Sequence, residues 1–123
     1  MFQGLMGNAR EVDAQELQRD LDAMLVEDER VLRAFKIIRD LFVFTNRRLI
    51  LIDKQGITGK KSDYHSIPYK SISHFSVETA GSFDLDAEMK IYISGNPVPI
   101  VREFKKGTDL VAVQKTLADY ILT

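Results

Sequence analysis

The segment Leu41–Asp53, with the sequence LFVFTNRRLILID, consists of two apolar runs on either side of a polar turn. Runs of β-branched and aromatic residues that flank a turn such as Thr45–Arg48 are typical of a β-hairpin. Asparagine tolerates the left-handed backbone conformation that a tight reversal needs, and the two arginines favour a solvated loop. Both runs are apolar at consecutive positions, which predicts strands with little solvent on either face. We expect a core on one face and a helix or a second copy of the chain on the other.

The composition of the whole chain is that of a single globular domain. It has 123 residues, of which 45% are hydrophobic and 28% charged, enough to bury one core. The absence of cysteine excludes disulfides, a thiolate nucleophile and a sulfur-ligated metal site. No apolar run approaches the roughly 18 to 20 residues needed to cross a bilayer, and the N-terminus is unlike a signal peptide. We therefore expect a cytoplasmic protein.

Charge is distributed unevenly along the chain. Residues 1–30 hold eight acids and three bases, whereas residues 31–123 hold ten acids and fourteen bases. We divide the chain accordingly into an acidic helical arm, 1–30, and a body, 31–123. Such an arm can dock on its own body or on a neighbouring copy. No strongly basic stripe is present, so a nucleic-acid partner is not expected.

Two helices and seven antiparallel strands are expected from the hydrophobic patterns. An amphipathic helix is predicted over residues 9–25, with Asn8 as its N-cap. Apolar and polar residues alternate without a break over residues 83–94, which predicts a strand with one buried face. A second amphipathic helix should follow Thr108 as its N-cap and run almost to the C-terminus. The other strands are expected at the two hairpin runs and at residues 31–38, 62–67, 71–78 and 98–104.

Six short motifs carry a family resemblance. They are FTNRRLI (44–50), DKQG (53–56), YHSIPY (64–69), FSVETAG (75–81), FDLDAE (83–88) and FKKGT (104–108). In this order they resemble the bacterial pleckstrin-homology-like family, long catalogued as a domain of unknown function. The resemblance implies an α+β fold: a bent seven-stranded antiparallel sheet or partly open barrel with a C-terminal capping helix. The N-terminal helix is an addition to that fold.

The resemblance also implies self-assembly into a closed ring, expected to be a pentamer, through the β-strands. Its hydrophilic surface near the strand junction would receive a protein partner, which the sequence does not identify. The candidate residues of that surface are Tyr64, His65, Thr79, Ser82, Asp84, Asp86 and Glu88.

The apolar hairpin is an independent reason to expect assembly. A chain that cannot cover both faces of such strands can hide them against a neighbour around a rotation axis. The candidate interface residues are Phe42, Phe44, Ile50 and Ile52. In the alternative, the C-terminal helix covers the second face and the protein is a monomer.

Basic loop residues suggest a second function. Eukaryotic pleckstrin-homology domains often bind phosphoinositides with basic residues in an early loop, and the candidates here are Arg47, Arg48, Lys60 and Lys61. Converging cations of this kind would form a site for an anionic lipid headgroup at a membrane surface. The simpler interpretation is that they are solvated loop charges. The resemblance itself does not imply lipid binding.

Candidate metal and catalytic residues are few. Asp84, Asp86 and Glu88 would share one strand face, where carboxylates can coordinate calcium or magnesium, but an amphipathic strand has such a polar face anyway. His65 and His74 are the only histidines, and no nucleophile elbow surrounds a serine near them. We therefore expect no enzyme, cofactor or metal. The function expected from the sequence is a ring-forming scaffold for protein interaction.

Overall fold

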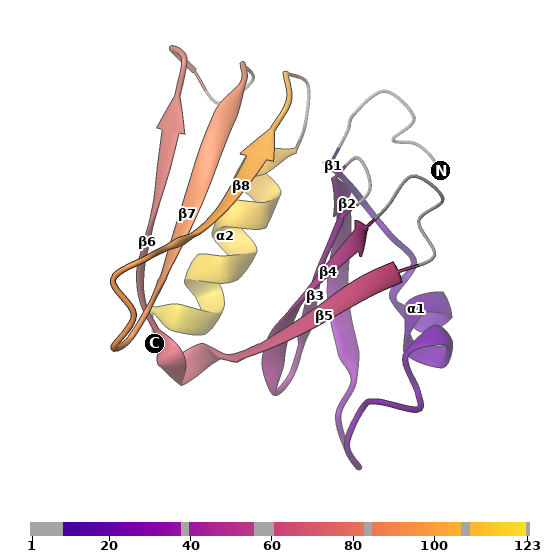
Figure 1. Cartoon of the computed structure of the whole chain (residues 1–123). Coiled ribbons are helices and arrows are strands. Elements are labelled where there is room, and N and C mark those ends of the chain that lie inside the picture. Colours follow the sequence, from indigo (N-terminus) through magenta and orange to yellow (C-terminus); the bar gives the residue numbers. More distant parts are fainter. Residues whose placement is uncertain (1–8, 38–39, 56–60, 83–84, 107–108, 123) are drawn as a thin grey trace. The chain divides into compact units, whose positions relative to one another are not determined.

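The computed structural model describes residues 9–37, 40–55, 61–82, 85–106 and 109–122 (Figure 1). These residues form two compact units. One consists of residues 11–68, and the described residues from Tyr69 onward are grouped with residues 9 and 10 in the other.

The first unit is built on an antiparallel sheet. Its strands, in sheet order, are β1 (Ala9–Glu11), β2 (Val31–Ile37), β3 (Asp40–Thr45), β4 (Arg48–Gln55) and β5 (Lys61–Pro68). The predicted hairpin is confirmed as β3 and β4, where Leu41 lies opposite Ile52 and Phe44 opposite Leu49.

The N-terminal helix is shorter than predicted. Helix α1 spans Ala14–Asp20, and its N-cap is Asp13, whose carboxylate accepts hydrogen bonds from the backbone N–H groups of Gln15 (2.9 Å) and Glu16 (3.4 Å). The predicted N-cap, Asn8, lies outside the described residues. The prediction that the helix starts at residue 9 was wrong, because residues 9–11 form β1 and the first free helical N–H groups find their acceptor at Asp13.

Both faces of the hairpin are buried within one chain. The exposed fractions of Phe42, Phe44, Ile50 and Ile52 are 0%, 0%, 0% and 3%. On one face, Leu17 and Leu21 from the α1 region belong to the same hydrophobic cluster as Ile50 and Ile52. On the other, the ring of Phe44 packs edge-on against Phe35, with centroids 6.2 Å apart.

Because its apolar residues are buried, the hairpin does not form the predicted interface between copies. The premise that one chain cannot cover both faces is wrong, because Phe42 and Phe44 are fully buried on one face. On the other face, the N-terminal arm supplies the apolar side chains that cover Ile50 and Ile52. Phe42, Phe44, Ile50 and Ile52 are therefore not available to a second copy of the folded chain.

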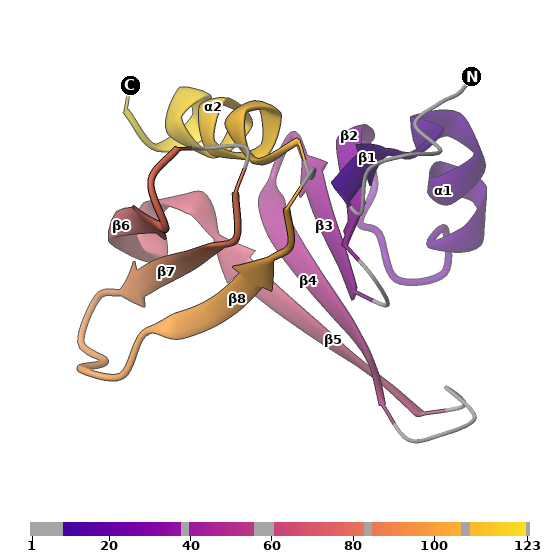
Figure 2. The same ribbon diagram turned by 90° about the horizontal axis from the view of Figure 1, so that it is seen from above.

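The second unit contains a three-stranded antiparallel sheet and the C-terminal helix. Its elements are the 3-10 turn η2 (Tyr69–Ser71), β6 (Ile72–Thr79), β7 (Ala87–Ile93), β8 (Ile100–Phe104) and α2 (Leu110–Ile121). Figure 2 shows α2 alongside these strands, and the Tyr69 ring of η2 stacks on Tyr120 of α2 with centroids 4.4 Å apart. The N-cap of α2 is Asp109, which accepts from the Ala112 N–H. The predicted N-cap, Thr108, lies outside the described residues.

The strand predicted at residues 83–94 begins later, at Ala87. Phe83 and Asp84 lie outside the described residues. The preceding residues form a turn: the Leu85 N–H donates to the Ser82 carbonyl, and Gly81 has a φ of +152°, which favours glycine. From Ala87 onward the predicted alternation is confirmed, with Ala87, Met89 and Ile91 buried. The seven expected strands are thus all present, in two sheets, and the expected α+β class with a C-terminal helix is confirmed.

Candidate partner-binding surface

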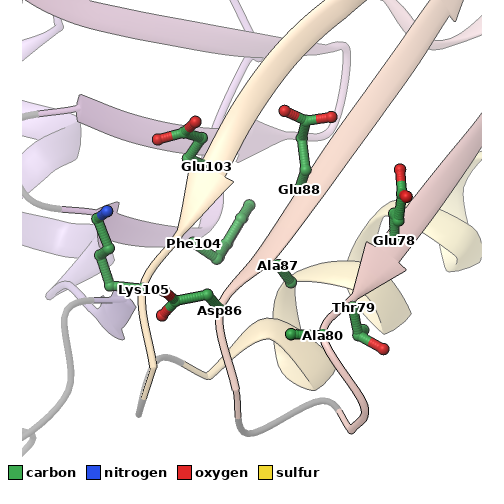
Figure 3. Close-up of a pocket in the computed structure, with 9 residues that line it drawn as sticks. All are labelled: Glu78, Thr79, Ala80, Asp86, Ala87, Glu88, Glu103, Phe104 and Lys105. Carbon is green, nitrogen blue, oxygen red and sulfur yellow. The ribbon is translucent and has the colours of Figure 1, made fainter.

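Three glutamates lie side by side across the sheet of the second unit. Glu78 of β6 is opposite Glu88 of β7, and Glu88 is opposite Glu103 of β8. Neighbouring strands are about 4.8 Å apart, so these positions are close together. Figure 3 shows their side chains on the three neighbouring strands. We call Glu78, Glu88 and Glu103 the acidic row.

The acidic row borders a pocket with a volume of about 390 Å³. Among the described residues that line it, four carry carboxylates and one, Lys105, is cationic. The lining residues are Glu78, Thr79, Ala80, Asp86, Ala87, Glu88, Glu103, Phe104 and Lys105. The pocket therefore favours a cationic group.

One lysine partly offsets the charge of the row. Lys90 lies two residues along β7 from Glu88, and its Nζ is 3.9 Å from Glu88 Oε1. Both side chains are about one-third exposed, and ion pairs of this kind contribute little. The acidic row keeps a net negative charge.

The structure brings together part of the predicted partner surface. Thr79, Asp86 and Glu88 line the pocket, and Ser82 is exposed in the turn after β6. Asp84 lies outside the described residues, while Tyr64 and His65 are exposed on β5, in the other unit. Sequence reasoning missed Glu78 and Glu103. Strand alternation places each on an outward face, but only the pairing register shows that they flank Glu88.

The predicted carboxylate face for a metal is not formed by β7. Asp86 precedes that strand, and its Oδ1 accepts a hydrogen bond from the backbone N–H of Lys106 at 2.7 Å. This bond joins the two chain segments that enter β7 and leave β8. Within the part of the chain that the structure describes, no group of three or more His, Cys, Asp or Glu residues is arranged to hold a metal ion.

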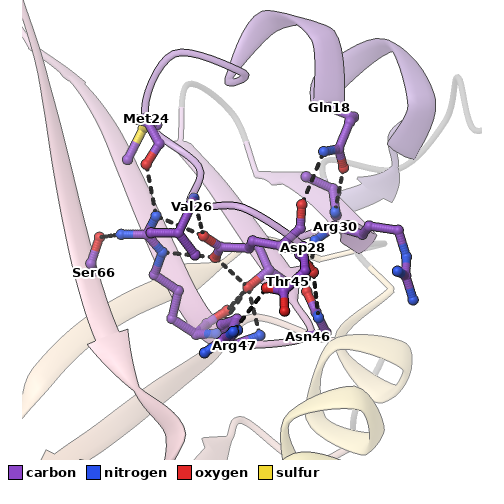
Figure 4. A network of polar contacts seen from close by, with 12 residues as sticks. Gln18, Met24, Val26, Asp28, Arg30, Thr45, Asn46, Arg47 and Ser66 are labelled. Carbon is purple, nitrogen blue, oxygen red and sulfur yellow. Dashed lines mark hydrogen bonds and ion pairs between the residues drawn. The ribbon is translucent and has the colours of Figure 1, made fainter.

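The basic hairpin turn holds a buried carboxylate (Figure 4). Arg48 donates from Nε to Glu29 Oε2 at 2.8 Å and from Nη2 to Glu29 Oε1 at 2.9 Å. The Thr45 hydroxyl donates to Glu29 Oε2 at 2.7 Å, and the Val26 N–H to Oε1 at 3.0 Å. Burial opposes ionisation of Glu29, but the hydrogen bonds from Arg48, Val26 and Thr45 outweigh it and lower the pKa of Glu29 to about 2.

The other side chains of the turn, Asn46 and Arg47, bind the residues on either side of Glu29. The Asn46 side chain accepts from the Arg30 N–H at 2.6 Å and donates to the Asp28 carbonyl at 3.0 Å, and Arg47 pairs with the Asp28 carboxylate at 2.8 Å. Among the non-glycine residues that the structure describes, the positive φ falls on Asp28 (64°) and not on Asn46. The interpretation of this turn as a solvated loop was therefore incomplete, because its side chains form hydrogen bonds and ion pairs with residues 24–30.

The candidate residues for an anionic ligand do not converge. Arg48 is paired with Glu29 and Arg47 with Asp28, and Lys60 lies outside the described residues. Lys61 faces Gln55, whereas Arg48 lies at the opposite end of β4, about 23 Å away along the strand. The three described candidates, Arg47, Arg48 and Lys61, therefore do not form one cationic site.

The two histidines have separate surroundings, each within its own unit. His65 is exposed on β5. The ring of His74 stacks on Tyr92 with centroids 4.2 Å apart, and the Ser73 hydroxyl lies 3.1 Å from His74 Nδ1. Neither histidine is among the residues that line the pocket.

The chain is similar to bacterial proteins of one family. A family model described as "Bacterial PH domain" matches residues 1–121. The uncharacterised protein YjqA of Bacillus subtilis is 58% identical over 116 residues, which cover 94% of this chain and 93% of that protein.

Two solved structures have similar folds. A pleckstrin-homology domain from Shewanella amazonensis has a TM-score of 0.86 and 60% identity, covering 97% of this chain and 96% of that one. A DUF1696 family protein with a pleckstrin-homology domain, from Shewanella loihica, has a TM-score of 0.79 and 58% identity, covering 94% and 98%. None of these three descriptions states an enzymatic activity. In the described part of this chain, no helix is long and apolar enough to cross a membrane.

Proposed function

This chain belongs to the bacterial PH-domain family, and on that basis we propose that it is a non-enzymatic protein-binding module. In this proposal, the acidic row receives a basic segment of a partner protein. The observation that carries it is the register that places Glu78, Glu88 and Glu103 opposite one another on three neighbouring strands.

The energetic cost of the acidic row supports a basic partner. Like charges directly opposite one another destabilise a sheet, and each cross-strand pair changes stability by roughly 0.2–1 kcal/mol. The row contains two such pairs, Glu78–Glu88 and Glu88–Glu103. A cationic partner would relieve this repulsion when it binds. The relief of the repulsion would then contribute to the free energy of binding.

The spacing of the row indicates a helical partner. Three strands about 4.8 Å apart place the outer two glutamates about 9.6 Å from each other. Basic residues at positions i, i+4 and i+7 of a helix share one face and span about 10.5 Å, whereas three alternate residues of an extended chain span about 13 Å. The helix matches the row more closely, so we propose that it lies across the strands.

The test uses two synthetic helical peptides of identical composition. One has lysines at i, i+4 and i+7, and the other has the same lysines distributed around the helix. We expect calorimetry at low salt to show at least about tenfold tighter binding of the first peptide, because three close charge pairs each add to affinity. Equal binding of the two peptides would contradict the helical match.

Variants of the protein distinguish binding at the acidic row from attraction to the net negative charge of the whole chain. Glu78→Gln, Glu88→Gln and Glu103→Gln together should abolish the preference between the peptides. The matched control changes Glu16→Gln, Asp20→Asn and Asp22→Asn, which are exposed acids of the N-terminal arm, and gives the same net charge. If the control lost as much affinity as the row variant, the proposal would be refuted.

Assembly into a closed ring, with a pentamer as the expected size, stays a prediction. The hairpin residues that motivated it are buried, so copies would have to meet elsewhere, and free strand edges are one such place. A ring would repeat the acidic row, and a multivalent basic partner would then bind with avidity. Light scattering at micromolar concentration measures the number of chains directly, and a monomer would contradict the ring.

A further inference from the structure

A stacked aromatic pair lies on the same face of the second unit's sheet as the acidic row. His74 of β6 is opposite Tyr92 of β7, and their rings are 4.2 Å apart between centroids at an angle of 13°. Tyr92 lies four residues after Glu88 on β7, so both side chains are on one side of the strand, about 13 Å apart. We call His74 and Tyr92 the aromatic platform.

A bulge in β6 and one hydroxyl hold the platform in place. The register of β6 against β7 shifts between Ile72 and His74, which leaves Ser73 as an additional residue. The Ser73 hydroxyl donates to the Tyr92 carbonyl at 3.2 Å and lies 3.1 Å from His74 Nδ1. Bulges are common beside functional sites, where they redirect side chains. A ring that is already held in this way loses little entropy when it binds a partner.

We propose that the aromatic platform binds an aromatic side chain of the same partner helix whose basic residues contact the acidic row. This inference rests on the proposed function and adds a second recognition element to it. A helix with its side chains is about 10–12 Å in diameter, close to the distance of about 13 Å between Glu88 and Tyr92 along β7. A helix that lies across the strands therefore reaches the row with one side and the platform with the other.

The residues between the row and the platform are compatible with this position. They are Ser76, Lys90 and Val101, which lie opposite one another on the three strands. Val101 is 39% exposed, and the helix would cover this apolar side chain. The Nζ of Lys90 is 3.9 Å from Glu88 Oε1, so the lysine side chain extends toward the row and leaves the platform accessible.

Lys90 also favours a neutral aromatic residue over arginine at the platform. Aromatic rings pair favourably with one another, and arginine stacks on aromatic rings as well. However, Lys90 is only two residues from Tyr92 on the same face of β7. It would repel a second cation at that place, whereas a phenylalanine ring carries no charge.

The helical repeat predicts where the aromatic residue lies in the partner. Successive residues of a helix are about 100° apart, so lysines at i, i+4 and i+7 share one side and residue i+5 is about 140° from residue i. Along the helix axis, residue i+5 lies between the second and third lysines. It is thus near the central strand β7, which carries both Glu88 and Tyr92.

Calorimetry with three synthetic helical peptides tests this motif on the unmodified protein. All three have lysines at i, i+4 and i+7. The first has phenylalanine at i+5, the second has it at i+11, on the lysine side of the helix, and the third has arginine at i+5. We expect the first peptide to bind about fivefold more tightly than the second, and more tightly than the third. Equal binding of the first two, or tighter binding of the third, would overturn the inference.

Variants of the protein locate the contact. His74→Thr together with Tyr92→Thr removes both rings and introduces residues that suit a strand, and this variant should bind the first two peptides equally. The control is Val111→Thr at an exposed residue of α2, which should keep the fivefold preference. Thermal melts establish that both variants are folded. A preference that persisted in the platform variant would refute the site.

The outcomes distinguish this inference from the proposed function. If the first two peptides bind equally while clustered lysines still bind better than distributed ones, the aromatic contact is wrong and the acidic row remains the binding site. If the lysine pattern makes no difference for the unmodified protein, the proposed function is wrong and this inference fails with it.

Discussion

Arg48 holds the Glu29 carboxylate through two parallel hydrogen bonds, of 2.8 and 2.9 Å. The side chain of Glu29 has no exposed surface and that of Arg48 is 21% exposed. Arg48 also donates to the carbonyl of Met24 and the hydroxyl of Ser66, both at 2.9 Å. One side chain thus joins the segment after α1 to β5. Arginine suits this position because its planar group offers several donors in a fixed geometry.

Replacing Glu29 should destabilise the protein strongly. Glu29→Gln removes the negative charge and leaves the guanidinium of Arg48 without its ionic partner, at an expected cost of about 3 kcal/mol in the free energy of unfolding. Urea denaturation measures this loss. As a control, Arg47→Ala removes an ion pair whose side chains are 54% and 66% exposed, and should cost less than about 1 kcal/mol. Equal losses in the two variants would contradict the structural role of Glu29.

The same pair predicts an acid-sensitive stability. The pKa of Glu29 is about 2 in the folded protein against a usual value of 4.5, so the folded state binds the proton more weakly than the unfolded state. The stabilisation is therefore fully present above about pH 4.5 and is lost as the pH falls from there toward 2. The full shift corresponds to about 3 kcal/mol. Over this window, the stability difference between wild type and Glu29→Gln should shrink; a constant difference would argue against the low pKa.

The buried face of β7 should be sensitive to truncation. Ile91 has no exposed surface, and Ile91→Ala should cost about 2–5 kcal/mol because it leaves a cavity. Val101 of the neighbouring strand is 39% exposed, so Val101→Ala should cost less than about 1 kcal/mol. Thermal or urea unfolding of the two variants checks the predicted face, and a larger loss at Val101 would show that the alternation had been assigned to the wrong side.

Neutralising one glutamate of the acidic row should stabilise the folded protein. Glu78→Gln removes one of two opposing charge pairs and should raise the free energy of unfolding by about 0.5 kcal/mol at low salt. The gain should fall at high ionic strength because exposed charges are screened. Glu27→Gln, an exposed glutamate in the segment after α1, is the control and should change stability little. A loss of stability in Glu78→Gln at low salt would mean that the row is not repulsive.

The local sequence determined the secondary structure of this protein to a large extent. The hairpin followed from two apolar runs around Thr45–Arg48, and the buried face of β7 from strict alternation after Ala87. Element boundaries were less predictable, because the start of α1 depends on which acceptor reaches its first N–H groups. Asp13 does so, and Asn8 lies outside the described residues.

Only the tertiary structure determined which distant residues the polar and apolar side chains contact. Arg48 was recognisable as a turn residue, but its partner Glu29 is 19 residues away, and no local pattern predicts such a pair. The hairpin was correctly predicted to be apolar on both faces, yet only packing shows that Leu17 and Leu21 cover one of them. The acidic row likewise arises from the register of three strands. Local propensity acts between near neighbours in the chain, whereas the pairing of distant charges and faces is set by how the strands and the arm come together.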